Sequence, residues 1–162
     1  MKPTKLVGIQ YAALPFRIRD RQVEVMLITS RGTQRWVIPK GWPMNGKRPQ
    51  DAAETEAAEE AGVVGEIEER PLGSYHYQKG LKDDRSMDVQ VIVFPLRVAF
   101  QAEDWKERHE RRAEWFRYQR AAALVAEPAL RHLIQDFGAD RTPTLLAQSL
   151  RSYRAWRAMA RG

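Results

Sequence analysis

Apolar residues in the first hundred positions form short runs, several of which alternate with polar residues, and this pattern is typical of β-strands. Segments 7–16 and 23–29 flank the polar turn Arg19-Asp20-Arg21-Gln22, so we expect them to pair as a hairpin. Further strands are predicted at 36–38, 65–69, 73–78 and 89–100, and a polar loop at 79–88 separates the last two.

Longer periodic segments predict four helices, at 49–61, 119–126, 128–137 and 143–160. Pro49 suits the first turn of the first helix, and Gly62 suits the left-handed position after its end. Gly138 is expected to end the third helix and Thr142 to start the fourth. One stripe of the fourth helix is mostly apolar, and we expect it to pack on the core, with a dimer contact or an anionic surface as alternatives; its residues are Leu146, Leu150, Tyr153 and Trp156 or Arg157.

The composition fits one globular domain over residues 1–162. No apolar run is long enough to span a bilayer, and the N-terminal Met-Lys-Pro-Thr-Lys lacks the apolar core of a signal peptide. The absence of cysteine excludes disulfides, thiol catalysis and zinc-thiolate sites. We therefore expect a soluble cytoplasmic protein without a membrane segment, and the composition leaves its oligomeric state open.

Charge is segregated along the chain. Residues 1–50 carry ten bases and two acids (+8), residues 51–100 carry five and eleven (−6), and residues 101–162 carry twelve and eight (+4). An acidic centre between basic flanks suits a polyanion that is held through metal on one side and through Arg or Lys on the other. Simple solubility is the alternative reading of the same pattern.

Three carboxylates in the helix predicted at 49–61 are the strongest chemical signal. Glu56, Glu59 and Glu60 are spaced i, i+3, i+4, which places them on one helix face. Like charges at this spacing cost about 0.2–0.5 kcal/mol per pair, and a divalent cation would turn that cost into a binding site. An acidic surface helix is the alternative, but such a helix would more often place bases at i+4.

This stretch resembles the Nudix box, the family pattern Gx5Ex7REUxEExGU in which U is a bulky aliphatic residue. Six positions match, namely Gly41, Glu56, Glu59, Glu60, Gly62 and Val63. Lys47 replaces the first Glu and Thr55 replaces the Arg, while Ala57 stands in for the aliphatic residue. In the family the two replaced residues would form a charge pair, and here we expect Lys47 to meet Glu54 or Asp51 instead.

The resemblance implies an α/β fold, a Nudix-type α/β/α sandwich with a mixed β-sheet between helices. It also implies a metal-dependent pyrophosphohydrolase that splits phosphoanhydrides by attack of water on phosphorus. Carried over by position, Glu56, Glu59, Glu60 and the carbonyl of Gly41 would bind Mg²⁺ or Mn²⁺. Glu60 is the expected general base, with Glu59 as the other box candidate and with three acids of the 79–88 loop as further alternatives, Asp83, Asp84 and Asp88.

Segments outside the box resemble the diphosphoinositol polyphosphate phosphohydrolases, a Nudix branch that also splits dinucleoside polyphosphates. The similar segments are Ser30-Arg31, Arg35-Trp36, Glu103-Asp104-Trp105 and Arg112-Ala-Glu114-Trp115-Phe116. This resemblance implies phosphate contacts for Ser30, Arg31 and Arg35, and Pro39-Lys40-Gly41 implies one for Lys40. The branch carries basic residues where this chain has Ile9-Gln10-Tyr11, which argues against inositol recognition.

Two classes of function stay open at this stage. The first is an enzyme that acts on a small-molecule phosphoanhydride, which the three box glutamates favour. The second is a non-catalytic Nudix-fold module that binds a nucleotide or RNA, and the basic flanks keep RNA possible without favouring it. Trp42, Tyr75 and Tyr77 are expected to pack, with stacking on a base as the alternative.

Overall fold

The computed structural model describes residues 6–161, apart from the side chains of residues 145–151. The described elements are β1 (Val7–Arg19), β2 (Gln22–Thr29), β3 (Trp36–Val37), β4 (Lys40–Gly41), α1 (Pro49–Ala61), β5 (Val63–Ile67), β6 (Gly73–Gly80), the short 3-10 helix η1 (Lys82–Asp84), β7 (Ser86–Gln101), β8 (Ala113–Arg117), α2 (Tyr118–Leu124), α3 (Pro128–Arg141) and α4 (Leu145–Met159).

The eight described strands form one mixed sheet. Its main path runs β3-β2-β1-β7-β5, while β4 pairs with β1, β6 with β7 and β8 with β2. The central pair β1 and β7 is parallel, and the other pairs are antiparallel. The predicted hairpin of the first two strands is confirmed, and its two turn residues, Asp20 and Arg21, adopt positive φ values of 50° and 62°. This geometry suits the right-handed twist of a two-residue hairpin.

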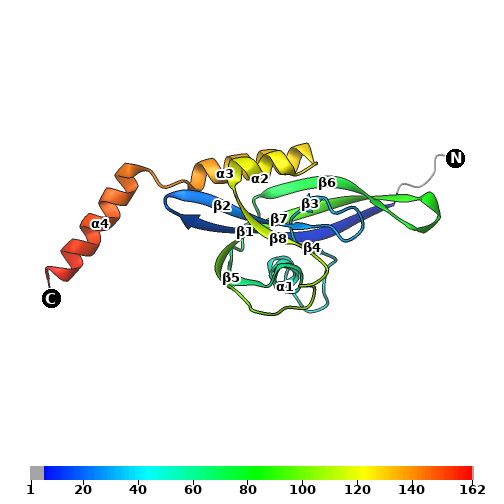
Figure 1. Ribbon diagram of the computed structural model, residues 1–162, viewed down its shortest axis with the longest axis horizontal. Helices are drawn as coiled ribbons and strands as arrows, with labels where there is room; N and C mark the ends of the chain where they lie inside the picture. The colour runs from blue at the N-terminus through cyan, green and yellow to red at the C-terminus, as the bar shows by residue number, and fades with distance from the viewer. Residues whose placement is uncertain (1–5, 162) are drawn as a thin grey trace.

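Helices cover both faces of the sheet. In Figure 1, α1 lies against one face while α2 and α3 lie along the opposite one. One core cluster joins α2 and α3 to the sheet, with Leu130, Ile134 and Phe137 packed near Leu14 and Phe16. A second cluster packs the alanines of α1 against the other face, and its buried residues include Ala13, Met26, Ile28, Ala53, Ala57, Ala61 and Phe94. The predicted α/β/α sandwich is therefore confirmed, whereas one domain over 1–162 stays a prediction.

Helix α1 begins and ends where the sequence predicts. Pro49 is its first residue, and Gly62 follows it with a φ of 69°, in the left-handed region that favours glycine. The same glycine is in contact with Trp105, because a Cβ built at position 62 would overlap the indole ring. The small alanines on the buried face let α1 lie close to the sheet, and Glu60 on this helix reaches the backbone of β4.

Several boundaries differ from the predictions, and three of these differences have a clear structural basis. Strands β6 and β7 pair as far as Gly80 and Ser86, so the predicted loop 79–88 shrinks to five residues, 81–85. Helix α3 continues through Gly138 to Arg141, because the missing side chain at 138 makes room for the Tyr118 ring. Thr142 caps the end of α3 through a 2.6 Å bond to the Gly138 carbonyl, rather than starting the next helix.

The last helix, α4, extends away from the sandwich (Figure 1). Tyr153 and Trp156 are 52% and 61% exposed, so the prediction that they pack on the core is wrong. The side chains of Leu146 and Leu150, which belong to the same prediction, lie outside the described residues. In the part of the chain that the structure describes, no helix has the length and apolar character needed to cross a membrane.

Candidate functional site

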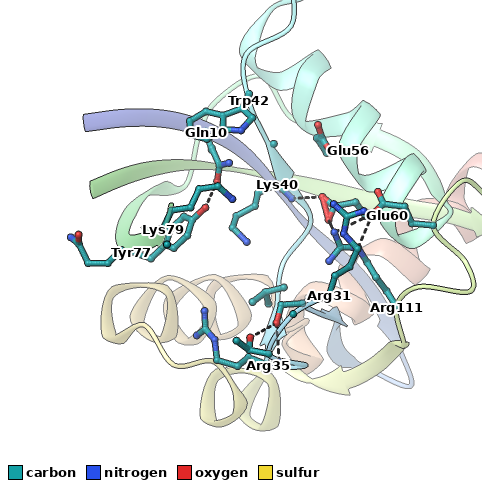
Figure 2. A pocket seen from close by; sticks show the side chains of 18 of the residues that line it. Gln10, Arg31, Arg35, Lys40, Trp42, Glu56, Glu60, Tyr77, Lys79 and Arg111 are labelled. Atoms are coloured by element: carbon teal, nitrogen blue, oxygen red, sulfur yellow. Dashed lines mark hydrogen bonds and ion pairs between the residues drawn. The ribbon is translucent and has the colours of Figure 1, made fainter. Parts of the chain in front are cut away.

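A cavity of about 760 Å³ is lined by residues of α1, β1, β4 and β6. Figure 2 shows Glu56, Glu60 and Arg111 on one side of it, Gln10, Tyr77 and Lys79 on the other, and Lys40 between them. The turn that follows β2 adds Ser30, Arg31 and Arg35 to the lining. One wall is therefore carboxylate-rich, while most of the remaining charged side chains around the cavity are cationic.

Glu60 is the most buried of the three box glutamates, with an exposed fraction of 5%. Its Oε1 accepts a hydrogen bond of 3.1 Å from the backbone N–H of Lys40, which ties α1 to β4. Its Oε2 lies 3.0 Å from Nη2 of Arg111. Burial raises the pKa of Glu60 to about 7, although the charge of Arg111 and the Lys40 N–H act in the opposite direction.

Glu56 lies directly against the backbone of β4. A Cβ built at Gly41 would overlap the Glu56 carboxylate, so only glycine permits this approach. Burial raises the pKa of Glu56, and the charges of Glu59 and Glu107 raise it further. Glu56 and Glu60 are thus two neighbouring carboxylates at the cavity wall, each of which is costly to ionise without a cation.

Glu59 points elsewhere. Its Oε2 lies 3.5 Å from Nζ of Lys106, and it does not belong to the residues that line the cavity. Accordingly, no three His, Cys, Asp or Glu side chains of the described residues are gathered in a group that could hold a metal ion. Helical spacing alone could not reveal this, because Lys106 reaches Glu59 from a distant segment.

The donor set fits a hard divalent cation nonetheless. All candidate ligands are oxygen atoms, which suit Mg²⁺ or Mn²⁺. The close approach of Glu56 to Gly41 places a carboxylate beside the backbone position that the box resemblance implies as a ligand. Burial raises the pKa of Glu56 and of Glu60, so the ionised carboxylates are disfavoured in the metal-free site, and a bound cation would favour them.

Arg111 and Glu107 are functional candidates that the sequence analysis missed. The Arg111 guanidinium donates 3.2 Å to Glu107 through Nε and 3.1 Å to the Thr29 carbonyl through Nη1, in addition to its contact with Glu60. Nη1 of Arg31 lies 3.5 Å from Glu107 on the cavity side. This chain of charges, Arg31, Glu107, Arg111 and Glu60, joins the cationic side of the cavity to the carboxylate wall. Only tertiary structure brings these positions together.

The four residues expected to contact phosphate all line the cavity, but they differ in their bonding partners and in their exposure; they are Ser30, Arg31, Arg35 and Lys40. The Ser30 hydroxyl accepts a 3.0 Å bond from the Arg35 N–H and lies 2.7 Å from the Thr33 hydroxyl, so it also holds the turn in shape. Arg35 forms an ion pair of 3.3 Å with Glu127. Arg31 is 61% exposed at its side chain and is the more accessible guanidinium.

Lys40 projects its ammonium group into the middle of the cavity, 5.1 Å from the centre of the Tyr77 ring. Burial lowers its pKa, although the charges of Glu60 and Glu127 raise it. Tyr77 donates a 2.7 Å hydrogen bond to Gln10, which fixes the ring beside the lysine. Among the described residues neither Lys40 nor Lys79 forms an ion pair, so both charges are available to an anion.

The other aromatic and acidic candidates differ in whether they line the cavity. Trp42 and Tyr77 line the cavity, whereas Tyr75 is a core residue with an exposed fraction of 2%. The alternative general bases of the 79–88 loop, Asp83, Asp84 and Asp88, are all absent from the cavity lining.

The two departures from the box contact each other. Nζ of Lys47 donates a 2.6 Å hydrogen bond to the hydroxyl of Thr55, which in turn donates 3.0 Å to the Asp51 carbonyl. Lys47 was expected to meet Glu54 or Asp51, but its hydrogen-bond partner is Thr55, the other residue that departs from the box. The Asp51 carboxylate bonds to Arg48 instead. The link between loop and helix is kept with a neutral acceptor in place of a charge.

Comparison with known proteins identifies the family. The NUDIX domain model matches residues 9–137. Diphosphoinositol polyphosphate phosphohydrolase 3-beta of Bos taurus is 31% identical over 138 residues, covering 82% of this chain and 79% of that protein. Its 3-alpha counterpart of Mus musculus is 35% identical over 117 residues, covering 70% and 66%. The resemblance to this branch that the sequence predicts is thereby confirmed.

Plant relatives and solved structures agree with this assignment. Nudix hydrolase 12, mitochondrial, of Arabidopsis thaliana is 29% identical over 119 residues, covering 72% of this chain. The chain spans between half and two thirds of the length of the Arabidopsis relatives that it matches. A C. elegans Ap4A hydrolase binary complex superposes with a TM-score of 0.61 at 19% identity, over 82% of this chain and 96% of that one, which shows the shared fold. On these grounds the chain belongs to the Nudix family.

Proposed function

We propose that this protein is a metal-dependent pyrophosphohydrolase that cleaves a phosphoanhydride bond by attack of water on phosphorus. The observation that carries the proposal is the division of the cavity, with Glu56 and Glu60 on one wall, Lys79 on the other and Lys40 between them; neither lysine forms an ion pair among the described residues. A polyphosphate fits this division, because its oxygens can meet a metal on one side and ammonium groups on the other.

Glu56 and Glu60 would hold the ion, together with the carbonyl of Gly41 and, after a change of rotamer, Glu59. A bound Mg²⁺ or Mn²⁺ would neutralise phosphate oxygens and increase the acidity of a water molecule. Glu60 would also accept the proton of the attacking water, with Glu59 as the alternative base. Burial raises the pKa of Glu60 to about 7 in the metal-free site, and a general base works best with a pKa near the working pH.

On the substrate side, Lys40 and Arg31 would bind phosphate oxygens of the substrate, and Ser30 and Arg35 would shape the turn that presents them. The substrate class we propose is a dinucleoside polyphosphate, a diphosphoinositol polyphosphate or another nucleoside diphosphate-linked compound. The names of the relatives support the first two. Water would add to one phosphorus atom while the bond between that phosphorus and the bridging oxygen breaks. Two products that each end in a phosphate group would then leave.

A substrate screen tests the proposal. Four classes would be incubated with Mg²⁺ or Mn²⁺: dinucleoside polyphosphates, inositol pyrophosphates, nucleotide sugars and damaged nucleoside triphosphates. All phosphate-bearing products, including nucleotides, sugar phosphates, phosphate and pyrophosphate, would be separated by anion-exchange chromatography for the wild type and for Glu56→Gln, with Glu54→Gln on the same helix as the matched control. The proposal expects turnover of at least one class that Glu56→Gln loses and Glu54→Gln keeps.

Binding without turnover in that screen would favour the second candidate, a non-catalytic nucleotide- or RNA-binding module. A solved structure with the same fold at 16% identity, the NUDIX domain of Shewanella oneidensis NrtR, is a cocrystal with ADP ribose.

The cytoplasmic location stays a prediction, and several plant relatives carry mitochondrial or chloroplastic names.

A further inference from the structure

The segment between β7 and β8, residues 102–112, brings two cations to the box helix. Nζ of Lys106 lies 3.5 Å from Oε2 of Glu59, and Nη2 of Arg111 lies 3.0 Å from Oε2 of Glu60. Glu56, in contrast, has a second carboxyl group, that of Glu60, as its hydrogen-bonding neighbour, and no ion pair of Glu56 is found among the described residues. Two of the three carboxylates that would bind the metal are thus already matched with a positive charge from the protein.

This segment is fixed along α1 by contacts that involve neither carboxylate. The Glu107 N–H donates 3.0 Å to the Glu59 carbonyl, and the Ala102 N–H donates 2.8 Å to the Gly62 carbonyl. Trp105 packs on Gly62, where any Cβ would overlap its ring. These contacts place Lys106 beside Glu59 as a consequence of the fold, rather than leaving its position to a flexible surface chain.

The two cations are held very differently. Arg111 is 11% exposed and keeps two other acceptors, Glu107 and the Thr29 carbonyl, if Glu60 turns away. Lys106 is 69% exposed and has Glu59 as its only ion-pair partner among the described residues. Arg111 can therefore yield Glu60 without losing its place, whereas Lys106 can swing into solvent.

We propose that Lys106 and Arg111 are built-in counter-cations, which a divalent ion must displace from Glu59 and Glu60, so that segment 102–112 sets the metal affinity of the site. The inference rests on the proposed function, because it assumes that the box carboxylates bind metal. It makes Lys106 a positioning residue that holds Glu59 out of the ligand set. As a result, the site binds metal less tightly, and the metal-free helix has a counter-cation for both Glu59 and Glu60.

Lys106→Gln is the decisive variant, because its exposed side chain can be changed with little effect on folding. Arg108→Gln is the matched control, since it removes the same charge from the same segment but pairs with Asp104, at 3.9 Å, instead of a box carboxylate. Mn²⁺ dissociation constants would be measured by titration calorimetry at one pH and one salt concentration. We expect Lys106→Gln to bind Mn²⁺ about two- to fivefold more tightly, the factor that an exposed ion pair corresponds to, and Arg108→Gln to match the wild type.

A second arm repeats the comparison in a Glu59→Gln background. There the gain from Lys106→Gln should disappear, because the carboxylate through which it acts is gone. Equal affinities for Lys106→Gln and Arg108→Gln, or weaker binding by Lys106→Gln, would overturn the inference while leaving the proposed hydrolase intact. A wild type that binds no Mn²⁺ would overturn both, and so the two failures can be told apart.

Discussion

Nη2 of Arg111 lies 3.0 Å from Oε2 of Glu60, and both side chains are almost completely buried. The pair joins the segment before β8 to the box helix, and a second buried carboxylate, Glu107, lies 3.1 Å from the same guanidinium nitrogen. One cation therefore serves two buried acids, which makes it the electrostatic centre of the carboxylate wall.

Replacing Arg111 with Met should strongly destabilise the metal-free protein, because Glu60 and Glu107 would be left buried without a cation. Loss of one partner from a buried ion pair costs about 3–5 kcal/mol. Chemical denaturation with and without Mn²⁺ measures this cost, with Arg108→Met as the control. Excess Mn²⁺ should recover part of the loss, and an unchanged free energy of unfolding would contradict the role given to Arg111.

The pKa of Glu60 leads to a prediction about stability and pH. Because its pKa is raised from 4.5 to about 7 in the folded state, the stability that this group contributes is complete below about pH 4.5 and is lost as the pH rises through about 7. Glu60→Gln cannot titrate, so its melting temperature minus that of the wild type should increase between these pH values. Melting curves of both proteins in chelator test this, and a constant difference would argue against the raised pKa.

The contact between Lys47 and Thr55 supports a double-mutant cycle that restores the family's residues. Lys47→Glu alone adds a negative charge near the box glutamates, and Thr55→Arg alone places a cation beside Lys47. The double variant should be more stable than the sum of the two single changes in unfolding free energy predicts, by a coupling free energy of about 0.5–3 kcal/mol. Melting and kcat/KM would be measured for all four proteins, and strict additivity would mean that the two positions do not interact in solution.

Neutralising two cations that line the cavity should change substrate affinity more than turnover. Lys40→Gln and Arg31→Gln are expected to raise KM more than they lower kcat, if both residues bind phosphates equally in the ground and transition states. The effect should grow with the number of phosphates in the substrate, and Lys82→Gln, outside the cavity, is the control. If short and long polyphosphates respond alike, these side chains do not contact the distal phosphates.

The sequence predicts much of this fold because its signals are local. Pro49 and Gly62 set the ends of α1, and the apolar runs of β1, β2 and β7 are unmistakable. Strand β8 was missed because Ala-Glu-Trp-Phe-Arg is short and only half-buried, so that its pairing with β2 defines it. Gly138 misled the prediction for α3, since its role is close packing with Tyr118 rather than helix termination.

Part of the candidate site could also be predicted from the sequence. The box spacing identifies Glu56, Glu59 and Glu60, and the segments before the box identify Ser30, Arg31, Arg35 and Lys40. Arg111, Glu107 and Lys106 could not be recognised, because only the packing of Trp105 on Gly62 brings their segment to the helix. Likewise, helical spacing places Glu59 with its neighbours but cannot show that its carboxylate lies beside Lys106.

The most direct test of the hydrolase proposal is the turnover of Glu60→Gln and Glu59→Gln on the best substrate in excess Mg²⁺, with Glu54→Gln as the control. Loss of a general base or of a metal ligand should lower kcat by about 10²- to 10⁴-fold. Metal-free melting temperatures check that Glu59→Gln and Glu60→Gln still fold, because each substitution removes the ion-pair partner of a cation, Lys106 or Arg111. Near wild-type rates for Glu59→Gln and Glu60→Gln would contradict the assignment of the carboxylate wall as the catalytic centre.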